Sequence, residues 1–409
     1  MEPSTAPSPD DLEAADDPTP EAEQEPFADD AAPRGRTSRR AVLAWTIGAA
    51  SAVAVIAGAV YVHVEAVNSF EASSTSMAAA VEAATDSWWS LDATRSAVAA
   101  SVVSAEQIVA DAADPLVDAT TRDALDAAAS AASDSVDAAA ALVDAGYDEG
   151  DIDDPFWTWQ MWEATAELEQ RGEAAAALVD EMAVAEAAVE SADTVLLESA
   201  LALYGSVEKA ARSIEQRNVS ARSTAVLDFR DAASEVVTQT DVGSQAALAV
   251  STYAHRLRQL TESNAAELAE KAGPLSATRL EIEAFARSIS GGVVLDFDWA
   301  PVVNGMGGAA GIGGLASWDT ARGGFSTITL SNSVAEWWPA ADARALVAHE
   351  VGHAITAKCH TKFDWESADA NEEWATAWAI SMGHTAVGNG VQAYGYPSQG
   401  MIDKAATCR

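Results

Sequence analysis

The chain divides into stretches that differ in the spacing of their hydrophobic and polar residues. Residues 41–64 form an apolar run without a single Asp, Glu, Lys or Arg. Over residues 65–290, Ala, Glu, Leu and Val dominate while glycine and proline are scarce, which is typical of long helices. From Gly291 on, short and partly alternating segments appear. These predict strands, followed by helices from about residue 340, in an α+β domain over 291–409.

The apolar run is long enough for a transmembrane helix. At about 1.5 Å per residue, a helix over 41–64 spans the roughly 30 Å hydrocarbon layer, with Trp45 and Tyr61 near its two ends. Four arginines lie just before it: Arg34, Arg36, Arg39 and Arg40. This asymmetry predicts a cell-membrane protein with a cytoplasmic N-terminus and an extracytoplasmic C-terminal domain. A cleaved signal peptide is the alternative, but the long run and the leader of about forty residues disfavour it.

The leader itself is acidic. Residues 1–33 contain many Asp and Glu, no basic residue, and only Leu12 and Phe27 as bulky apolar residues beyond Met1. Such a segment cannot bury enough surface to offset chain entropy. We therefore expect 1–40 to be a disordered cytoplasmic tail with a basic juxtamembrane end. An acidic docking tail is the alternative.

The helical stretch is interrupted at a few places. We expect breaks near 113–118, 147–156, 217–223 and 272–274. The alanine-rich segments between them predict antiparallel coiled-coil pairs or a bundle over 65–290, an extracytoplasmic stalk through which the chain could self-associate. The aromatic segment FWTWQMW (156–162) is expected to plug one end of this bundle, with a binding surface as the alternative.

Charge and cysteine content restrict the partners and the compartment. The net charge of −40, from 23 basic and 63 acidic residues, argues against nucleic acid as a partner. The two cysteines, Cys359 and Cys408, can form a single disulfide. An extracytoplasmic position favours that bond, and two unpaired thiols are the alternative.

The segment HEVGH (349–353) carries the clearest chemistry. His349 and His353 are four residues apart, so on a helix both imidazoles face one side and can reach the same zinc ion. Zinc lowers the pKa of a bound water toward about 7, and Glu350 on the next helical position could take that proton as a general base. The chain has only six histidines, and the flanks of this motif are uncharged. Burying polar residues in such a helix costs free energy unless they have partners, so their presence indicates a specific role.

A catalytic zinc site usually has a third protein ligand. Glu372 and Glu373 lie 19 and 20 residues after His353, far enough for a connection and a second helix that crosses the first. Glu372 would share its helical face with small residues such as Ala375 and Ala379, which permits close approach. The neighbours of Glu373 are nearly as small, so packing favours Glu372 without excluding Glu373.

The two motifs together resemble the gluzincin group of zinc metallopeptidases. In its aminopeptidase branch, the helix of the third ligand reads Asn-Glu, any residue, an aromatic residue and alanine, and smaller zincin-like families share a related pattern. The matching residues are Asn371, Glu372, Glu373, Trp374, Ala375, Trp378 and Ala379. The resemblance covers about 340–385. It implies a compact zincin-like domain, not an aminopeptidase, with His349, His353 and Glu372 as zinc ligands.

The resemblance also implies how substrate would bind. In zincins a strand before the metal helix forms a sheet edge that pairs with a peptide, and FSTITLS (325–331) is the candidate here, with an ordinary core strand as the alternative. His384, Tyr394 and Tyr396 follow the ligand helix, where related enzymes keep a donor for the transition-state oxyanion. Asp364 and Asp369 are candidate partners of a zinc-bound histidine.

The sequence therefore favours a membrane-anchored, zinc-dependent endopeptidase that hydrolyses a peptide or protein substrate. The alternative is a helical envelope scaffold or binding protein whose zinc domain is structural or inactive. The size of the helical region, 65–290, supports that alternative.

Overall fold

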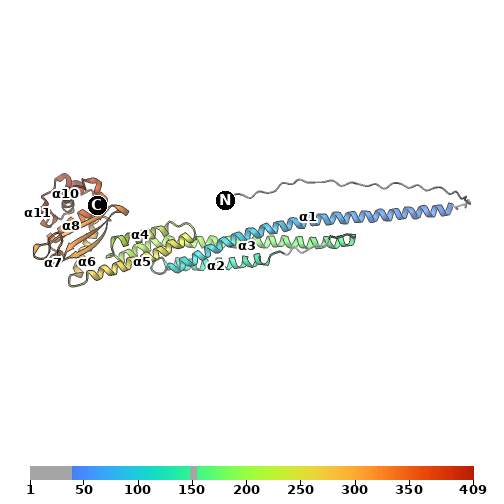
Figure 1. The fold of residues 1–409 in the computed structure, drawn as a ribbon, viewed down its shortest axis with the longest axis horizontal. Helices are drawn as coiled ribbons and strands as arrows, with labels where there is room; N and C mark the ends of the chain where they lie inside the picture. The colour runs from blue at the N-terminus through green and yellow to red at the C-terminus, as the bar shows by residue number, and fades with distance from the viewer. Residues whose placement is uncertain (1–38, 148–153) are drawn as a thin grey trace, which may run out of the picture. The chain divides into compact units, whose positions relative to one another are not determined.

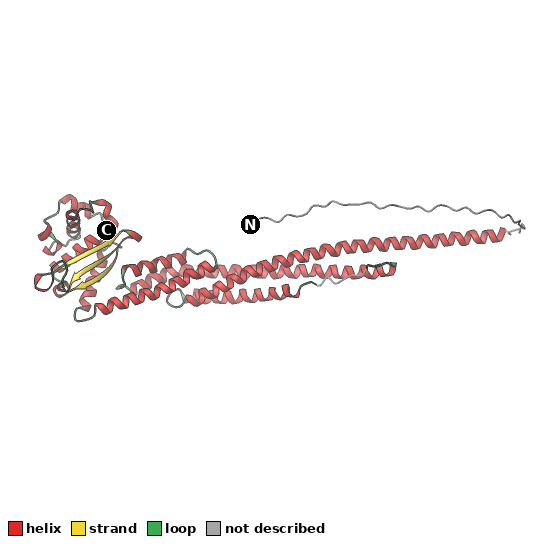
Figure 2. Cartoon of the chain, in the orientation of Figure 1, coloured by secondary structure: helices red, strands yellow, loops and turns green. Residues whose placement is uncertain are grey.

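The computed structural model describes residues 39–147 and 154–409, with side chains from residue 49 on. These residues are mostly helical and include one small sheet near the C-terminus (Figures 1 and 2). The expected acidic tail and the Trp45 side chain lie outside this description. The chain divides into two units, residues 1–69 and 70–409.

Helix α1 (Arg39–Asp111) begins in the first unit and continues into the second. It is the one helix among the described residues that is long and apolar enough to cross a membrane. The apolar side chains of its residues 49–64, among them Val53, Val55 and Ile56, are largely exposed. Exposed apolar residues in such density are costly in water and favourable in lipid.

Four further helices form the elongated part of the second unit. They are α2 (Ala119–Ala145), α3 (Thr158–Arg217), α4 (Ser223–Val237) and α5 (Ser244–Glu270). The breaks between α1, α2, α3 and α4, and the one that follows α5, agree with the predicted positions. The break at 238–243, between α4 and α5, was not predicted from the sequence.

The helices pack in alternating directions around one hydrophobic core. The Ser73 hydroxyl of α1 donates to Glu169 of α3 at 3.3 Å, and the pair Ser90–Glu186 repeats the same offset of 96 residues at 2.7 Å. A constant offset means that α1 and α3 run parallel. Helix α2 follows α1 and precedes α3 in the sequence. It runs antiparallel to both, as in an up–down–up bundle.

The aromatic segment does not plug the bundle. Phe156, Trp157, Trp159 and Trp162 are 74%, 52%, 56% and 53% exposed. Helix α2 ends at Ala145, and the Tyr147 hydroxyl just beyond it donates to the Arg171 carbonyl at 3.1 Å. The first turns of α3 therefore extend past α2 and lack its cover. The prediction of a plug was wrong for this reason.

The C-terminal part has its own core, which begins in α6 (Ser276–Ile289). Its sheet contains β1 (Val294–Ala300), β2 (Gly314–Asp319) and β3 (Phe325–Ser331) in the order β1-β3-β2. Strand β3 pairs parallel with β1 and antiparallel with β2. The segment FSTITLS is therefore the central strand, so the alternative of an ordinary core strand is confirmed and the expectation that it forms the edge was wrong. Strands β1 and β2 form the two edges of the sheet.

Short helices follow the sheet. They are α7 (Asn332–Trp337), α8 (Ala341–Ala354), α9 (Thr356–Cys359), α10 (Ala368–Ser381), α11 (Val391–Tyr394) and α12 (Gln399–Ala405). Single 3-10 turns are η1 (Gly308–Ala310), η2 (Ala321–Gly323), η3 (His360–Lys362) and η4 (Val387–Asn389). A disulfide joins Cys359 to Cys408. The Trp378 indole of α10 donates to the Cys408 carbonyl at 2.9 Å, so the C-terminus is held against α10.

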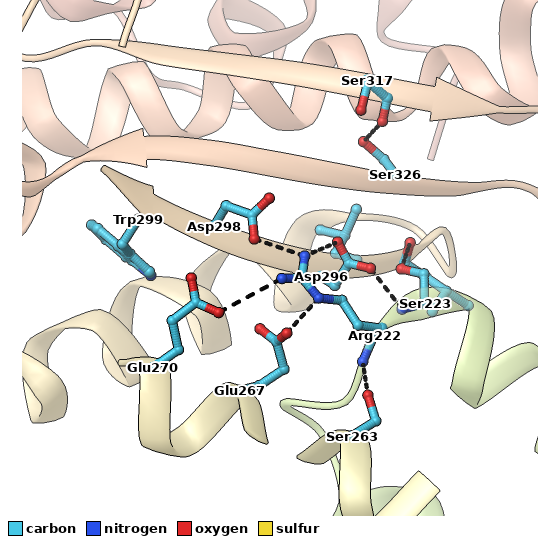
Figure 3. Close-up of polar contacts among 12 residues, drawn as sticks. Arg222, Ser223, Ser263, Glu267, Glu270, Asp296, Asp298, Trp299, Ser317 and Ser326 are labelled. Atoms are coloured by element: carbon cyan, nitrogen blue, oxygen red, sulfur yellow. Dashed lines mark hydrogen bonds and ion pairs between the residues drawn. The ribbon is translucent and has the colours of Figure 1, made fainter. Parts of the chain in front are cut away.

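A charged cluster connects the helices to the sheet (Figure 3). Arg222, between α3 and α4, pairs with Asp298 of β1 at 2.7 Å and with Glu267 of α5. The backbone N–H of Ser223 donates to Asp296 of β1 at 2.7 Å. Because Glu267 and Asp296 are buried, their charges need these partners. The cluster fixes β1 to the end of the helical part.

Candidate metal centre

Helices α8 and α10 cross with their backbones almost in contact. A Cβ atom placed on Gly352 would lie 2.8 Å from the Cα of Ala375, which is too close for any side chain. The Trp374 indole donates to the Gly352 carbonyl at 3.1 Å and ties the two helices at this point. The small residues expected on both helical faces therefore allow side chains on α8 and α10 to reach one another.

Three side chains converge at the crossing: His349 and His353 of α8 and Glu372 of α10. The Nε2 atoms of the two histidines are 3.1 Å apart, and Oε2 of Glu372 lies 3.2 Å from the first and 3.3 Å from the second. Tetrahedral ligands at about 2.0–2.1 Å from zinc are about 3.3–3.4 Å apart. The three atoms thus match one face of such a tetrahedron, and this His-His-Glu group could hold a metal ion.

The protonation of His349 suits a metal ligand. Its Nδ1 lies 2.9 Å from the carbonyl oxygen of Asn389 in η4. A carbonyl oxygen can only accept, so Nδ1 donates to it, and Nε2 is the nitrogen that faces the centre. Gly390 makes this contact feasible, because a Cβ there would lie 2.8 Å from Cε1 of His349 and its φ of +96° favours glycine.

The adjacent glutamates have different partners. Burial by itself would raise the pKa of Glu372, but the imidazoles of His349 and His353 hold it at about 2. Glu372 is therefore ionised at neutral pH, as a metal ligand must be. Glu373 points elsewhere and accepts hydrogen bonds from the backbone N–H and the hydroxyl of Ser398, at 3.1 and 3.0 Å. Ser398 is the N-cap of α12, so Glu373 supports that helix start.

Glu350 lies beside the three converging side chains and is only 4% exposed. Burial raises its pKa to about 7, the nearby Glu372 carboxylate adds to this effect, and His349 opposes it. Its carboxylate packs against Gly314, the first residue of β2, where a Cβ would lie 2.4 Å from Oε1. A carboxyl group with this pKa can both take up and release a proton near neutral pH.

Two cavities, of about 420 and 290 Å³, open on this centre. The residues that line both are Asn304, Gly314, His349, Glu350 and Tyr394. The smaller cavity continues along Leu315, Ala316 and Trp318 of β2 to Glu372. The edge strand thus forms one wall of a cleft that runs past the His-His-Glu group.

The three expected oxyanion donors lie in different surroundings. The Tyr394 ring stacks on His349 with ring centroids 6.0 Å apart and faces both cavities. Burial raises the pKa of Tyr394, as do Glu372 and Glu350, so the phenol keeps its proton. His384 packs edge-on against Phe285 of α6 instead, with ring centroids 5.4 Å apart. Tyr396 is exposed. Of the three, Tyr394 is positioned to reach a molecule in the cleft.

Sequence reasoning missed the partners of the histidines. It considered Asp364 and Asp369, whereas the contacts of His349 come from the Asn389 carbonyl and the Thr376 hydroxyl. Every residue has a backbone carbonyl, so the sequence does not reveal which carbonyl bonds to His349. Gly390 indicates the close approach only once the loop is known to lie against His349.

Comparisons of the chain with protein-family models, with curated protein sequences and with solved structures find no match. Its function must therefore be argued from the geometry of this centre.

Proposed function

We propose that the chain is a membrane-anchored, extracytoplasmic zinc-dependent peptidase. The observation that carries this proposal is the triangle of His349, His353 and Glu372 atoms, with buried Glu350 beside it in a cleft along an edge strand. The N-terminal arginines and the apolar helix support the proposed orientation, with the C-terminal domain outside the cell.

The donor set favours zinc. Two imidazole nitrogens and one carboxylate oxygen, with edges near those of a tetrahedron, are typical of catalytic zinc sites with three protein ligands. When bound, zinc would supply a Lewis acid that polarises a peptide carbonyl and activates a water molecule.

The remaining roles belong to side chains of the cleft. Glu350 would accept the proton of the attacking water and pass it to the nitrogen of the leaving amine, as its pKa of about 7 allows. The Tyr394 hydroxyl would donate a hydrogen bond to the oxygen that becomes negative during attack. Asn389 would hold His349 in the tautomer required of a ligand.

The edge strand indicates the substrate class. Strand β2 pairs only with β3 among the described strands, and its residues Leu315, Ala316 and Trp318 line the cleft. An extended peptide could add to β2 through main-chain hydrogen bonds and run past Glu350. This mode of binding suits a peptide or protein substrate.

A structural metal site fits the geometry less well. Structural zinc sites are usually closed by four protein ligands, whereas three ligand residues converge here among the described residues, next to two cavities. The scaffold alternative remains an outcome of the following experiment.

The test is the Glu350→Gln variant of the full chain, assayed with a peptide library and by metal analysis. Gln keeps the shape of the side chain but cannot take a proton, so we expect one zinc per chain and a loss of cleavage of about 10²- to 10⁴-fold. Glu366→Gln is the matched control, because Glu366 is exposed and lines neither cavity. Zinc binding with no cleavage by the unaltered chain would favour the scaffold. Full activity of Glu350→Gln would contradict the mechanism.

A further inference from the structure

The edge strand β2 presents the backbone groups of alternate residues to a peptide. In an antiparallel pair, successive residues direct their N–H and C=O groups to opposite sides of the strand. The Ser331 N–H of β3 donates to the Gly313 carbonyl at 2.9 Å, so Gly313 faces β3. The Ser326 hydroxyl of β3 likewise donates to the Ser317 carbonyl at 2.7 Å (Figure 3). The residues of the other parity therefore face the free edge: Gly314, Ala316 and Trp318.

A tight turn over 303–306 occupies the first of these three positions. Two backbone hydrogen bonds of 2.9 and 2.8 Å close the turn, and Asn304 in it has the left-handed φ of +51° that asparagine tolerates. The Asn304 side-chain amide donates to the Gly314 carbonyl at 3.1 Å. This bond takes the place of a substrate N–H. An added peptide would therefore pair with the edge beyond Gly314 and leave it at Gly314.

Glu350 lies at the end of β2 where this pairing stops. Its carboxylate packs against Gly314, so the peptide bond to be cleaved would pass close to this level. Trp318 lies four residues further along β2, about 13 Å away at about 3.3 Å per residue. A substrate residue opposite Trp318 is therefore about four residues from the cleaved bond, and it lies on one side of that bond only.

Two tryptophans form the surface at this far end of the cleft. Trp318 is half-buried and lines the smaller cavity, together with Ala368 at the start of α10. Its ring packs edge-on against Trp365, with centroids 5.5 Å apart, and Trp365 is 42% exposed. Side chains that lie opposite each other on paired strands are in contact, and aromatic rings in such pairs favour aromatic and aliphatic partners. The far end of the cleft thus suits an apolar side chain.

We propose that Trp318 and Trp365 form a recognition subsite for an aromatic or large aliphatic side chain about four residues from the cleaved bond. This inference rests on the proposed function, because it requires a peptide bound along β2. Trp318 is here a specificity-determining residue, which contacts the substrate far from the proton transfer at Glu350. Its contact would be the same before and during the reaction, so its loss should raise KM and leave kcat almost unchanged.

The test uses the full chain with zinc, a peptide library and mass spectrometry of the cleaved bonds. We expect aromatic and large aliphatic residues to be enriched about 5-fold near the fourth residue on one side of the cleaved bond. The same distance on the other side should show no enrichment. Trp318→Ala should remove the enrichment. A peptide pair that differs only by Phe or Ser at this position should show an equal ratio in kcat/KM, carried by KM.

Three further variants separate recognition from folding. Trp318→Phe keeps an aromatic ring and should retain most of the enrichment, whereas Trp365→Ala removes the ring that packs against Trp318 and should lower it in part. Trp89→Ala is the matched control, because Trp89 is 62% exposed and lines neither cavity. Zinc content shows whether each variant keeps its metal centre. If Trp318→Ala does not, unchanged enrichment in Trp365→Ala overturns the proposal.

The outcomes distinguish the subsite from the peptidase. One-sided enrichment that Trp318→Ala removes and Trp89→Ala preserves supports the proposal. Cleavage without this enrichment, or with enrichment that survives Trp318→Ala, overturns the subsite while the peptidase stands. Enrichment of arginine or lysine at this position would also overturn it, because the subsite would then select charge. If the unaltered chain cleaves no peptide, the proposed function fails and the subsite fails with it.

Discussion

Glu372 and Glu373 differ in role although they are adjacent and chemically identical. Successive residues of a helix point about 100° apart, so only one of them can face α8. Glu372 meets the two histidines, and Glu373 meets Ser398. The sequence favoured Glu372 through small neighbours and through a family resemblance, and the contacts give the physical basis for the difference.

Paired substitutions test this difference. Glu372→Gln should lower zinc affinity by more than the roughly 10- to 100-fold that loss of an outer-shell partner costs, because a charged ligand is removed. Glu373→Gln should keep zinc affinity and lower stability by about 1 kcal/mol, through a weaker contact with the N-cap of α12. Competition with a chelator and thermal unfolding measure the two effects. Loss of zinc in Glu373→Gln alone would reverse the assignment.

At the scale of elements, the crossing of α8 and α10 is held from several sides. Gly352 permits the close approach, and the buried Trp374 indole bonds across it. On the far side, Trp378 bonds to the C-terminal segment, which the disulfide joins to the end of α9. The three candidate ligands therefore lie on two helices that are fixed against each other, which suits a preorganised centre.

The disulfide should contribute mainly to stability. It closes a separation of 49 residues, for which loop-closure entropy predicts a contribution of up to about 4 kcal/mol. We expect Cys359→Ser/Cys408→Ser to lower the unfolding midpoint of the C-terminal core in a thermal scan, while zinc binding at 25 °C persists.

Reduction provides the control for this prediction. A reducing agent should bring the unaltered chain to the midpoint of the double variant and leave that variant unchanged. If the unfolding midpoint changed neither on reduction nor on substitution, the disulfide would contribute nothing to stability.

At the scale of the whole molecule, one chain combines a candidate membrane helix, a helical bundle and a candidate metal centre. The Arg222 cluster joins the last two of these parts, because it fixes β1 of the sheet to the end of the helical part.

Orientation is testable in intact cells that express the full chain with a tag at each end. The arginines before the apolar run predict that external protease removes the C-terminal tag and spares the N-terminal tag. Replacing Arg34, Arg36, Arg39 and Arg40 with glutamine should increase the fraction of inverted chains. Digestion of the N-terminal tag alone in the unaltered chain would contradict the proposed topology.

The sequence by itself determined the local features of this protein. Apolar length indicated a candidate membrane helix, helix-favouring composition predicted the long helices, and proline- and glycine-containing segments marked most of their ends. The i, i+4 spacing of His349 and His353 also sets a shared helical face by local geometry. Such features depend on residues close together in the chain, so they can be inferred without a fold.

Only the tertiary structure decided which distant segments meet. It assigned FSTITLS to the centre of the sheet and β1 and β2 to its edges, because strand order depends on pairing between segments and not on their own pattern. It left the aromatic side chains of 156–162 largely exposed, because α2 ends before it can cover the first turns of α3. It also brought the Asn389 carbonyl to His349, a contact that no side chain encodes.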